Sequence, residues 1–161
     1  MNSLQITTHP DVGQVFNNYP PAVRKKIRNL RRLILDVASN TEDISDLEET
    51  LKCGEPSYLT KHGSTIRIDW KARTPDQYAM YFKCTSRLVS SFKAVYGETF
   101  RYEGDRAIVF QMDDGIPDVE LKHCIAAGLR YHKVKQLPLL GLVPTKKTRH
   151  RETPGLKQST G

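Results

Sequence analysis

The chain has 161 residues, of which 38% are hydrophobic, and a mean hydropathy of −0.53. This length predicts one domain with a core of its own, and no apolar run approaches the roughly 20 residues of a membrane-spanning helix. The first residues include neither a basic nor an apolar leader segment, so we expect no secretory signal. Three cysteines at wide spacing favour reduced thiols in the cytoplasm over a disulfide framework.

The net charge of +7 is concentrated at one end of the chain. Residues 133–161 contain seven Lys or Arg and one Glu, which leaves residues 1–132 nearly neutral at +1. We expect a single domain at residues 1–145 and a basic, disordered tail at residues 146–161. This tail contains no Phe, Trp or Tyr, so we expect only non-specific attraction to nucleic acid.

Two helices are predicted near the N-terminus. Residues 9–18 form a short helix, and the prolines at positions 20 and 21 suit the start of the next one. Residues 22–39 carry the strongest helical pattern, with apolar residues spaced by three and four: Val23, Ile27, Leu30, Ile34 and Val37. The basic residues lie largely away from this stripe, either as a solvated face or as a surface for an acidic partner: Arg24, Lys25, Arg28, Arg31 and Arg32.

The acidic segment at residues 40–49 is expected to be a solvated loop that faces the basic helix. It lacks the residue spacing and the turn glycine of a calcium loop. Its carboxylates nevertheless belong to the ligand type that suits ferrous iron, and the candidates for a weak iron site are Glu48, Glu49, Asp113 and Asp114.

The clearest strand signals lie between residues 48 and 84. Residues 64–70 alternate, with Ile66, Ile68 and Trp70 on one face and Thr65, Arg67 and Asp69 on the other. Residues 77–83 repeat the pattern, and the polar segment 71–76 connects the two strands as a hairpin. Residues 50–53 and 57–60 are shorter strands. Between them Pro56, which has no N–H, marks a break, a bulge or a sheet edge.

The second half of the chain predicts two more helices and a hairpin. A helix runs from Thr85 or Ser86 to Tyr96, where Gly97 ends it. Residues 100–103 and 106–112 form the hairpin, the last helix runs from Pro117 to about residue 132, and residues 137–144 lie extended. The pattern predicts an α+β fold in which an antiparallel sheet of about five to six strands packs against helices.

The motif Gly54-x-Pro56-x-Tyr58 and the phrases GSTIRIDWK, PDQYAMYFKC, FRYEGDRAIVF and YHKVKQLPLLG carry a family resemblance. By this motif and these phrases, residues 10–141 resemble a proteobacterial branch of the YdhG-like family, domain of unknown function 1801. The resemblance implies a small cytoplasmic α+β domain, a two-layer sandwich similar to frataxin, with a largely uncharacterised function. Relatives usually have tryptophan where this chain has Cys53. If that tryptophan lines a pocket in relatives, the pocket here is altered.

The resemblance also implies an alternative function, because some members of the family are described as frataxin-like iron chaperones. Frataxins have an acidic first long helix, whereas residues 22–39 here are basic. Cysteines and histidines show no CxxC or HxxxH spacing, so no zinc site is predicted. The chain has no GxSxG, P-loop or GxGxxG motif, and the one nucleophile–base pair left open is Cys53 with His62. A non-catalytic protein is therefore favoured, and an unrecognised enzyme is kept as a further alternative.

The leading hypothesis is a non-catalytic module that binds a small ligand or a protein partner on the polar face of its sheet. On neighbouring strands, the side chains that converge there are Arg67, Asp69, Tyr81 and Lys83. The turn that contains Gly54, Glu55, Pro56 and Tyr58 forms the rim of this predicted site. The alternative interpretation is an ordinary solvated face with a weak ion pair. The sequence leaves open whether the chain is a monomer or a homodimer.

Overall fold

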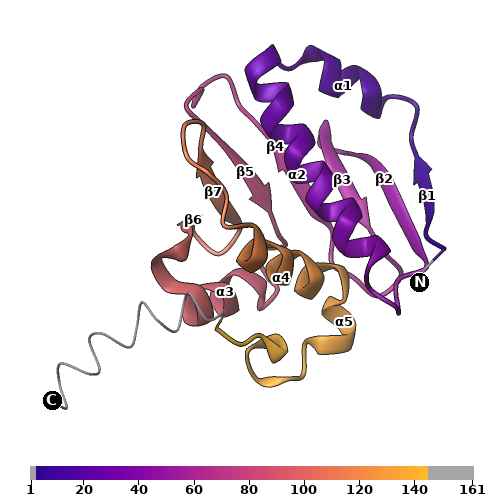
Figure 1. The fold of residues 1–161 in the computed structure, drawn as a ribbon, viewed down its shortest axis with the longest axis vertical. Coiled ribbons are helices and arrows are strands. Elements are labelled where there is room, and N and C mark those ends of the chain that lie inside the picture. The colour runs from indigo at the N-terminus through magenta and orange to yellow at the C-terminus, as the bar shows by residue number, and fades with distance from the viewer. Residues whose placement is uncertain (1–2, 145–161) are drawn as a thin grey trace, which may run out of the picture.

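The computed structural model describes residues 3–144, and its centre is a seven-stranded sheet with helices on one side (Figure 1). The strands follow the order β1-β2-β3-β4-β5-β7-β6, and all neighbours are antiparallel except the parallel pair β1 and β2. The strands are β1 (Gln5–Thr8), β2 (Asp46–Lys52), β3 (Glu55–Leu59), β4 (Ile66–Asp69), β5 (Gln77–Tyr81), β6 (Arg101–Glu103) and β7 (Ala107–Gln111). The α+β prediction is confirmed.

The helical layer comes from both halves of the chain. Its elements are α1 (Val12–Asn18), α2 (Pro21–Ser39), α3 (Leu88–Tyr96), α4 (Asp118–Leu129) and α5 (Tyr131–Val134), with 3-10 turns η1 (Gly97–Thr99) and η2 (Pro138–Gly141). In Figure 1, α2 and α4 lie across the sheet, α1 lies at one end and α5 at the other. Within residues 3–144, no helix is long and apolar enough to cross a lipid bilayer.

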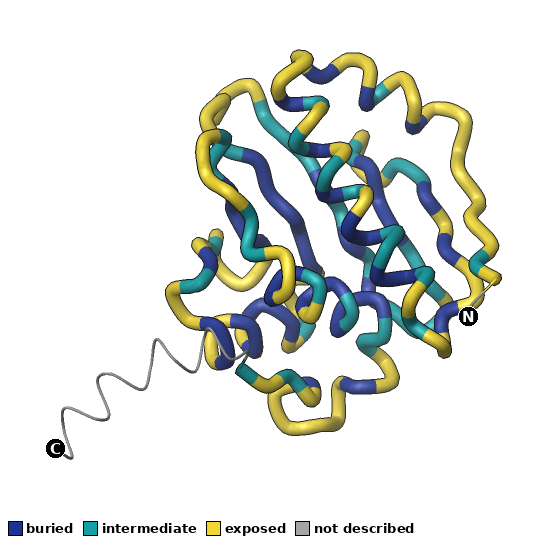
Figure 2. Tube along the Cα trace, viewed as in Figure 1, coloured by how far each residue is buried: buried dark blue, intermediate teal, exposed yellow. Residues whose placement is uncertain are grey.

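The main core lies between the sheet and this helical layer. The alternating residues Ile66, Ile68, Tyr78 and Met80 point into it and are almost fully buried. They meet the apolar stripe of α2, in which Ile27, Leu30 and Ile34 are inaccessible to solvent: the predicted stripe faces the sheet. Figure 2 shows the result as buried central strands beneath α2, with an exposed β1 at the edge.

The sheet has more strands than the five to six expected, and the difference lies near the N-terminus. Residues 46–49, predicted to lie in a solvated loop, extend the strand predicted at residues 50–53 toward the N-terminus to form β2, and β1 pairs with β2 in parallel. The inward positions of β2 are Leu47, Glu49 and Leu51, so a glutamate interrupts the apolar alternation that marks a half-buried strand. Because Arg31 of α2 neutralises Glu49, this inward carboxylate is tolerated.

Two helices and the segment after the last helix also differ from the prediction. The short helix begins at Val12 rather than residue 9, and the last predicted helix is interrupted at Arg130 into α4 and α5. Residues 138–141, predicted to be extended, form the compact turn η2, in which Leu139 and Leu140 have positive φ. The predicted tail at residues 146–161 lies outside the described residues.

Candidate binding site on the open sheet face

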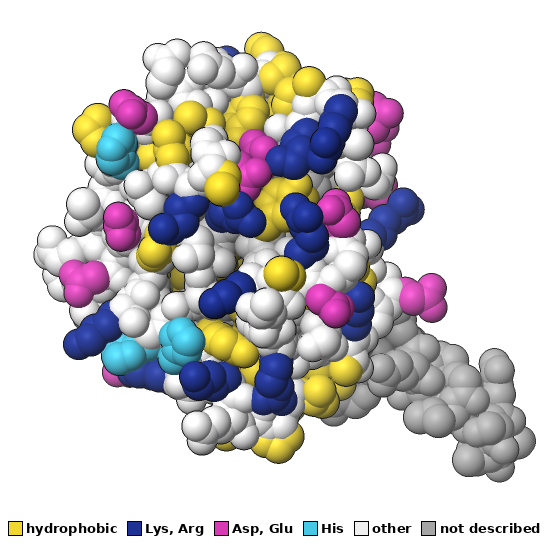
Figure 3. All heavy atoms as spheres, turned by 180° about the vertical axis from the view of Figure 1, so that it is seen from behind, with side chains coloured by type: hydrophobic (Ala, Val, Ile, Leu, Met, Phe, Trp, Pro, Cys, Tyr) yellow, Lys and Arg dark blue, Asp and Glu magenta, His cyan; other side chains and the backbone are white. Residues whose placement is uncertain are grey.

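The side of the sheet away from the helices, which we call the open face, has a small apolar centre. Ala79, Tyr81, Ala107 and Val109 form a separate buried cluster on β5 and β7. Their positions follow from the register, in which Tyr81 is opposite Ala107 and Ala79 is opposite Val109. Figure 3 views this face and shows Lys and Arg side chains gathered over it, with fewer acidic ones among them.

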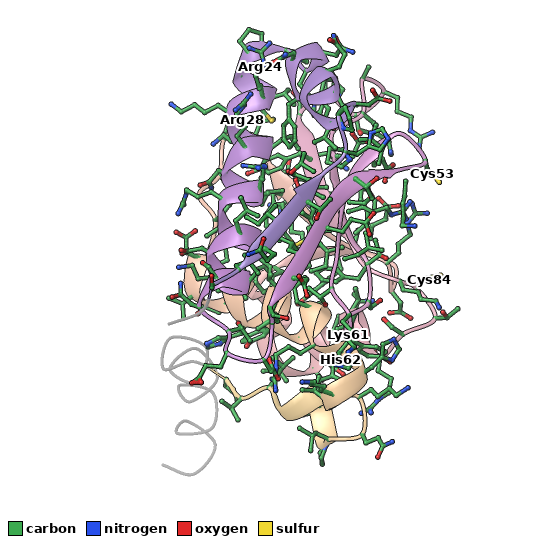
Figure 4. The ribbon with its side chains drawn as sticks, turned by 90° about the vertical axis from the view of Figure 1, so that its right-hand side faces the viewer. Arg24, Arg28, Cys53, Lys61, His62 and Cys84 are labelled. Atoms are coloured by element: carbon green, nitrogen blue, oxygen red, sulfur yellow. The ribbon has the colours of Figure 1, made fainter. Side chains whose placement is uncertain are left out.

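The β2–β3 hairpin forms one wall of the open face. Its two-residue loop, Cys53-Gly54, has both residues at positive φ, which is the type I′ turn that matches strand twist. Figure 4 places Cys53 at the tip of this hairpin, on the side of the molecule away from Arg24 and Arg28 of α2. The turn that the sequence singled out therefore does border the open face.

Pro56 lies inside β3 at the point where pairing with β4 ends. Lys52 and Glu55 are the hydrogen-bonded pair that closes the hairpin. Because hydrogen-bonded and non-hydrogen-bonded pairs alternate along antiparallel strands, the next pair, Leu51 and Pro56, exchanges no hydrogen bonds between β2 and β3. The missing N–H of Pro56 therefore faces β4, and the β3–β4 ladder stops at Ser57↔Arg67. The proline marks the end of a ladder within a central strand.

A network of charged and phenolic groups occupies the end of β4. The Lys71 ammonium lies 3.0 Å from a carboxylate oxygen of Glu55 and 3.0 Å from one of Asp69. Tyr19, in the connection between α1 and α2, donates a 2.6 Å hydrogen bond to the other oxygen of Asp69. Each carboxylate is only 14% exposed, so the network is held in place rather than freely solvated. We call it the open-face network.

The ring of Tyr81 stands beside this network among three cations. The guanidinium carbons of Arg67 and Arg106 lie 5.8 and 5.5 Å from the ring centroid, and the Lys71 nitrogen lies 5.4 Å from it. Arg67 also lies 3.4 Å from Glu55, an ion-pair distance without a hydrogen bond. Cations over an aromatic ring are stabilised by its negative face, so Tyr81 gathers positive charge at the centre of the open face.

The titration behaviour of the network suits binding better than proton transfer. Burial by itself lowers the pKa of Lys71, but its hydrogen bonds to Glu55 and Asp69 outweigh this effect and raise the pKa above its ordinary value. Burial raises the pKa of Tyr81, and burial together with the bond to Asp69 raises that of Tyr19. At neutral pH the ammonium stays charged and both phenols stay protonated, so none of the three is poised to act as a base.

Arg67 links the network to a hollow of about 270 Å³ on the same face. The residues that line this hollow are Lys52, Cys53, Ser64, Thr65, Arg67, Phe82 and Lys83. Continuing the register of Arg67 opposite Tyr81 by two residues places Thr65 opposite Lys83. The structure thus brings the predicted residues Arg67, Tyr81 and Lys83 to one face, although Lys83 lies beyond the end of β5.

Two predicted rim residues lie on the wrong side of the sheet. Tyr58 points into the core, where its hydroxyl donates a 2.7 Å hydrogen bond to Glu49, and Pro56 is buried on that same side. Period-two alternation explains both, because in β3 only Glu55, Ser57 and Leu59 face outward. Of the predicted rim, Gly54 and Glu55 border the open face.

Three residues of the site were not predicted from the sequence: Lys71, Arg106 and Tyr19. Lys71 continues the alternation of Arg67 and Asp69 by one step, a signal that was available but assigned to the hairpin loop. Arg106 and Tyr19 reach the site from distant parts of the chain, and no local sequence pattern predicts that they lie there.

The four carboxylates proposed for iron are not brought together. Glu49 is buried and bonded to Arg31, Tyr58 and Thr8, while Glu48 points to the opposite face of β2. Asp113 and Asp114 follow β7, which three strands separate from β2. Within residues 3–144, no group of three or more His, Cys, Asp or Glu side chains is placed to hold a metal ion.

The Cys53–His62 pair is also separated. Cys53 precedes β3 and His62 follows it, so the two lie at opposite ends of that strand (Figure 4). All three cysteines have free thiols, and Cys124 is buried, with burial raising its pKa.

Comparisons with protein-family models, with curated proteins and with solved structures find no match to this chain. The resemblance to the YdhG-like family therefore stays a prediction, and function is argued from the geometry of the open face.

Proposed function

We propose that this protein is a non-catalytic, cytoplasmic binding domain that takes a small anionic ligand on its open sheet face. The observation that carries the proposal is the convergence of Arg67, Lys71 and Arg106 on the ring of Tyr81. The adjoining hollow adds Lys52 and Lys83 to Arg67 in its lining. A concave surface with convergent cations and one aromatic ring is suited to an anion that carries a small organic group.

The chemistry of the face supports binding over catalysis. Tyr19 and Tyr81 remain protonated at neutral pH because their pKa values are raised, so neither is poised to accept a proton. The free thiols of Cys53, Cys84 and Cys124 support a reducing compartment such as the cytoplasm.

Native mass spectrometry of the full chain, purified gently from the cells that produce it, tests the proposal. We expect a bound organic mass in the wild type and its loss in Arg67→Ala and in Tyr81→Ala. Lys93→Ala is the matched control, because Lys93 also pairs with an aspartate and lies 5.7 Å from a tyrosine ring, but on another part of the surface.

Each outcome of this measurement decides between alternatives. A bound mass that survives both substitutions would show that the open face is not the site. A mass of one or two iron atoms would favour the iron-carrier alternative instead. An empty chain would shift the proposal to an acidic segment of a partner protein, tested by pull-downs with wild type and Arg67→Ala.

A further inference from the structure

The hollow beside Arg67 adjoins a second hollow of about 240 Å³, and both have Ser64, Thr65 and Lys83 in their linings. The second hollow also reaches the segment after β5 and the start of α5, with Thr85, Ser86 and His132 in its lining. Figure 4 shows Cys84, in the middle of that segment, on the same side of the molecule as Cys53. Residues that are distant in sequence thus surround one shared corner of the open face.

The charged side chains that line these two hollows are all cations. Lys52, Arg67 and Lys83 line the first hollow, and Lys83 also lines the second. Neither lining contains an Asp or Glu among the residues that the structure describes. Within residues 3–144, no carboxylate forms an ion pair with Lys52 or Lys83. An anion is therefore the complementary occupant.

Ser64 supplies an independent observation. It is only 7% exposed, and its hydroxyl has no hydrogen-bond partner in the described part of the chain. A buried hydroxyl without a partner costs stability, so such a group in a folded protein calls for an explanation. Ser64 lines both hollows, so a ligand oxygen that reached this hydroxyl would satisfy it.

The loop that carries Ser64 is held rigidly against the end of α4. The Ser64 amide donates to the carbonyl of Gly128 at 2.9 Å, and the Thr60 hydroxyl donates to that of Leu129 at 2.6 Å. At Gly63, a Cβ atom would lie 2.6 Å from the Leu129 oxygen, so only glycine allows this close approach. The corner is thus organised before any ligand arrives, which reduces the entropic cost of binding.

We infer that this corner binds the phosphate group of a small phosphate monoester, whose organic part extends along the first hollow toward Arg67 and Tyr81. A phosphate dianion offers several acceptor oxygens, which match a set of Lys and Arg cations together with serine and threonine hydroxyls. A carboxylate has two oxygens and one charge, so it would leave more of these donors unmatched. This inference rests on the proposed function and specifies the chemical class of its ligand.

Amide NMR spectra of the full chain, titrated with phenyl phosphate, inorganic phosphate and benzoate, test the inference. We expect saturable shifts at Ser64, Thr65 and residues 83–86 with both phosphates, and affinity for benzoate weaker by roughly tenfold or more. Lys83→Ala should weaken phenyl phosphate binding by roughly tenfold. Lys61→Ala, an exposed lysine outside both linings, is the control and should leave the affinity unchanged.

Ser64→Ala separates a binding role from a structural one. Because the hydroxyl has no protein partner, its removal should leave the urea midpoint unchanged or raise it. The same substitution should weaken phenyl phosphate binding severalfold. A lower midpoint with unchanged affinity would mean that Ser64 serves the fold alone, and it would overturn the assignment of this corner.

The remaining outcomes distinguish this inference from the proposed function. Equal affinity for benzoate and phenyl phosphate, or no saturable shift with either phosphate, would overturn the phosphate assignment. If Arg67→Ala still removed the mass bound in purified protein, the open face would remain a binding site for another anion. A third outcome combines two results: Lys83→Ala weakens phosphate binding, but Arg67→Ala keeps the ligand that purifies with the protein. This outcome would confirm phosphate binding at the corner and refute the proposed function.

Discussion

Two clusters of the same side-chain types lie on opposite faces of this sheet. On the helix side, Glu49 accepts hydrogen bonds from Arg31, Tyr58 and Thr8 and is 1% exposed. On the open face, Glu55 and Asp69 face Lys71 and Arg67 beside Tyr81. The first cluster, which we call the closed network, has no oxygen left for a ligand. The open-face network keeps Arg67 and Lys71 within reach of solvent, beside the buried ring of Tyr81.

The difference shows that burial and saturation, rather than residue type, separate a structural carboxylate from a binding surface. The β2–β3 hairpin supplies both clusters, because neighbouring residues of a strand point to opposite faces. Glu49 and Tyr58 point to the helices, whereas Glu55 points outward. Three substitutions and one change of pH test this contrast.

Arg31→Met should have the largest effect, because it leaves the buried Glu49 carboxylate without its cation. We expect the free energy of unfolding to fall by about 3–5 kcal/mol, measured by urea denaturation. The exposed neighbour Arg32→Met is the control and should change little. Adding Glu49→Leu to Arg31→Met should recover much of the loss. If Arg31→Met lowered the free energy of unfolding as little as Arg32→Met does, the closed network would not be important for stability.

Lowering the pH should destabilise the protein through the same carboxylate. Burial alone raises the pKa of Glu49, but the hydrogen bonds from Arg31, Tyr58 and Thr8 outweigh it and hold the pKa below its ordinary 4.5. A carboxyl with a lowered pKa contributes its full stability above the ordinary value and loses it as the pH falls toward the folded-state pKa. Urea midpoints measured from pH about 6 to about 3 should therefore fall more steeply in wild type than in Glu49→Gln. Parallel curves would contradict this assignment.

Cys53→Asn should stabilise the hairpin that joins the two clusters. Cys53 has a φ of +54°, which asparagine adopts more readily than cysteine. We expect a gain of about 0.5–1 kcal/mol in the free energy of unfolding, measured by thermal or urea denaturation. Cys84→Asn provides the comparison, because Cys84 is also exposed but does not have a positive φ. Equal effects of the two substitutions would exclude relief of backbone strain as the cause.

Lys71→Met should have the smallest effect on stability, although Lys71 bonds to two carboxylates. These carboxylates are 14% exposed, whereas Glu49 is 1% exposed, so solvent reaches them more readily after Lys71 is removed and the loss should stay below about 1 kcal/mol. If native mass spectrometry detects a ligand in the wild type, that ligand should nevertheless bind more weakly to Lys71→Met. A loss of stability comparable to that of Arg31→Met would show that the open-face network is also a structural one.

Part of the candidate site could be predicted from local pattern. Alternation placed Arg67, Asp69 and Tyr81 on one face, and the structure confirms that they share it. The same rule also predicts that Pro56 and Tyr58 alternate with Glu55, and the error arose from treating the whole turn as a rim. Lys71 was missed for a similar reason, since the strand-like alternation continues past the last strand residue, Asp69.

Local sequence pattern was sufficient to predict the α2 stripe, the inward and outward faces of β4 and β5, and the α+β class, because these depend on periodicity within a few residues. The folded structure was needed to show that Arg31 neutralises Glu49, that Tyr19 bonds to Asp69, and that Ser64 and Lys83 line the same hollow. These pairs are distant in sequence. Such contacts depend on strand register and helix packing, which no short window of sequence contains.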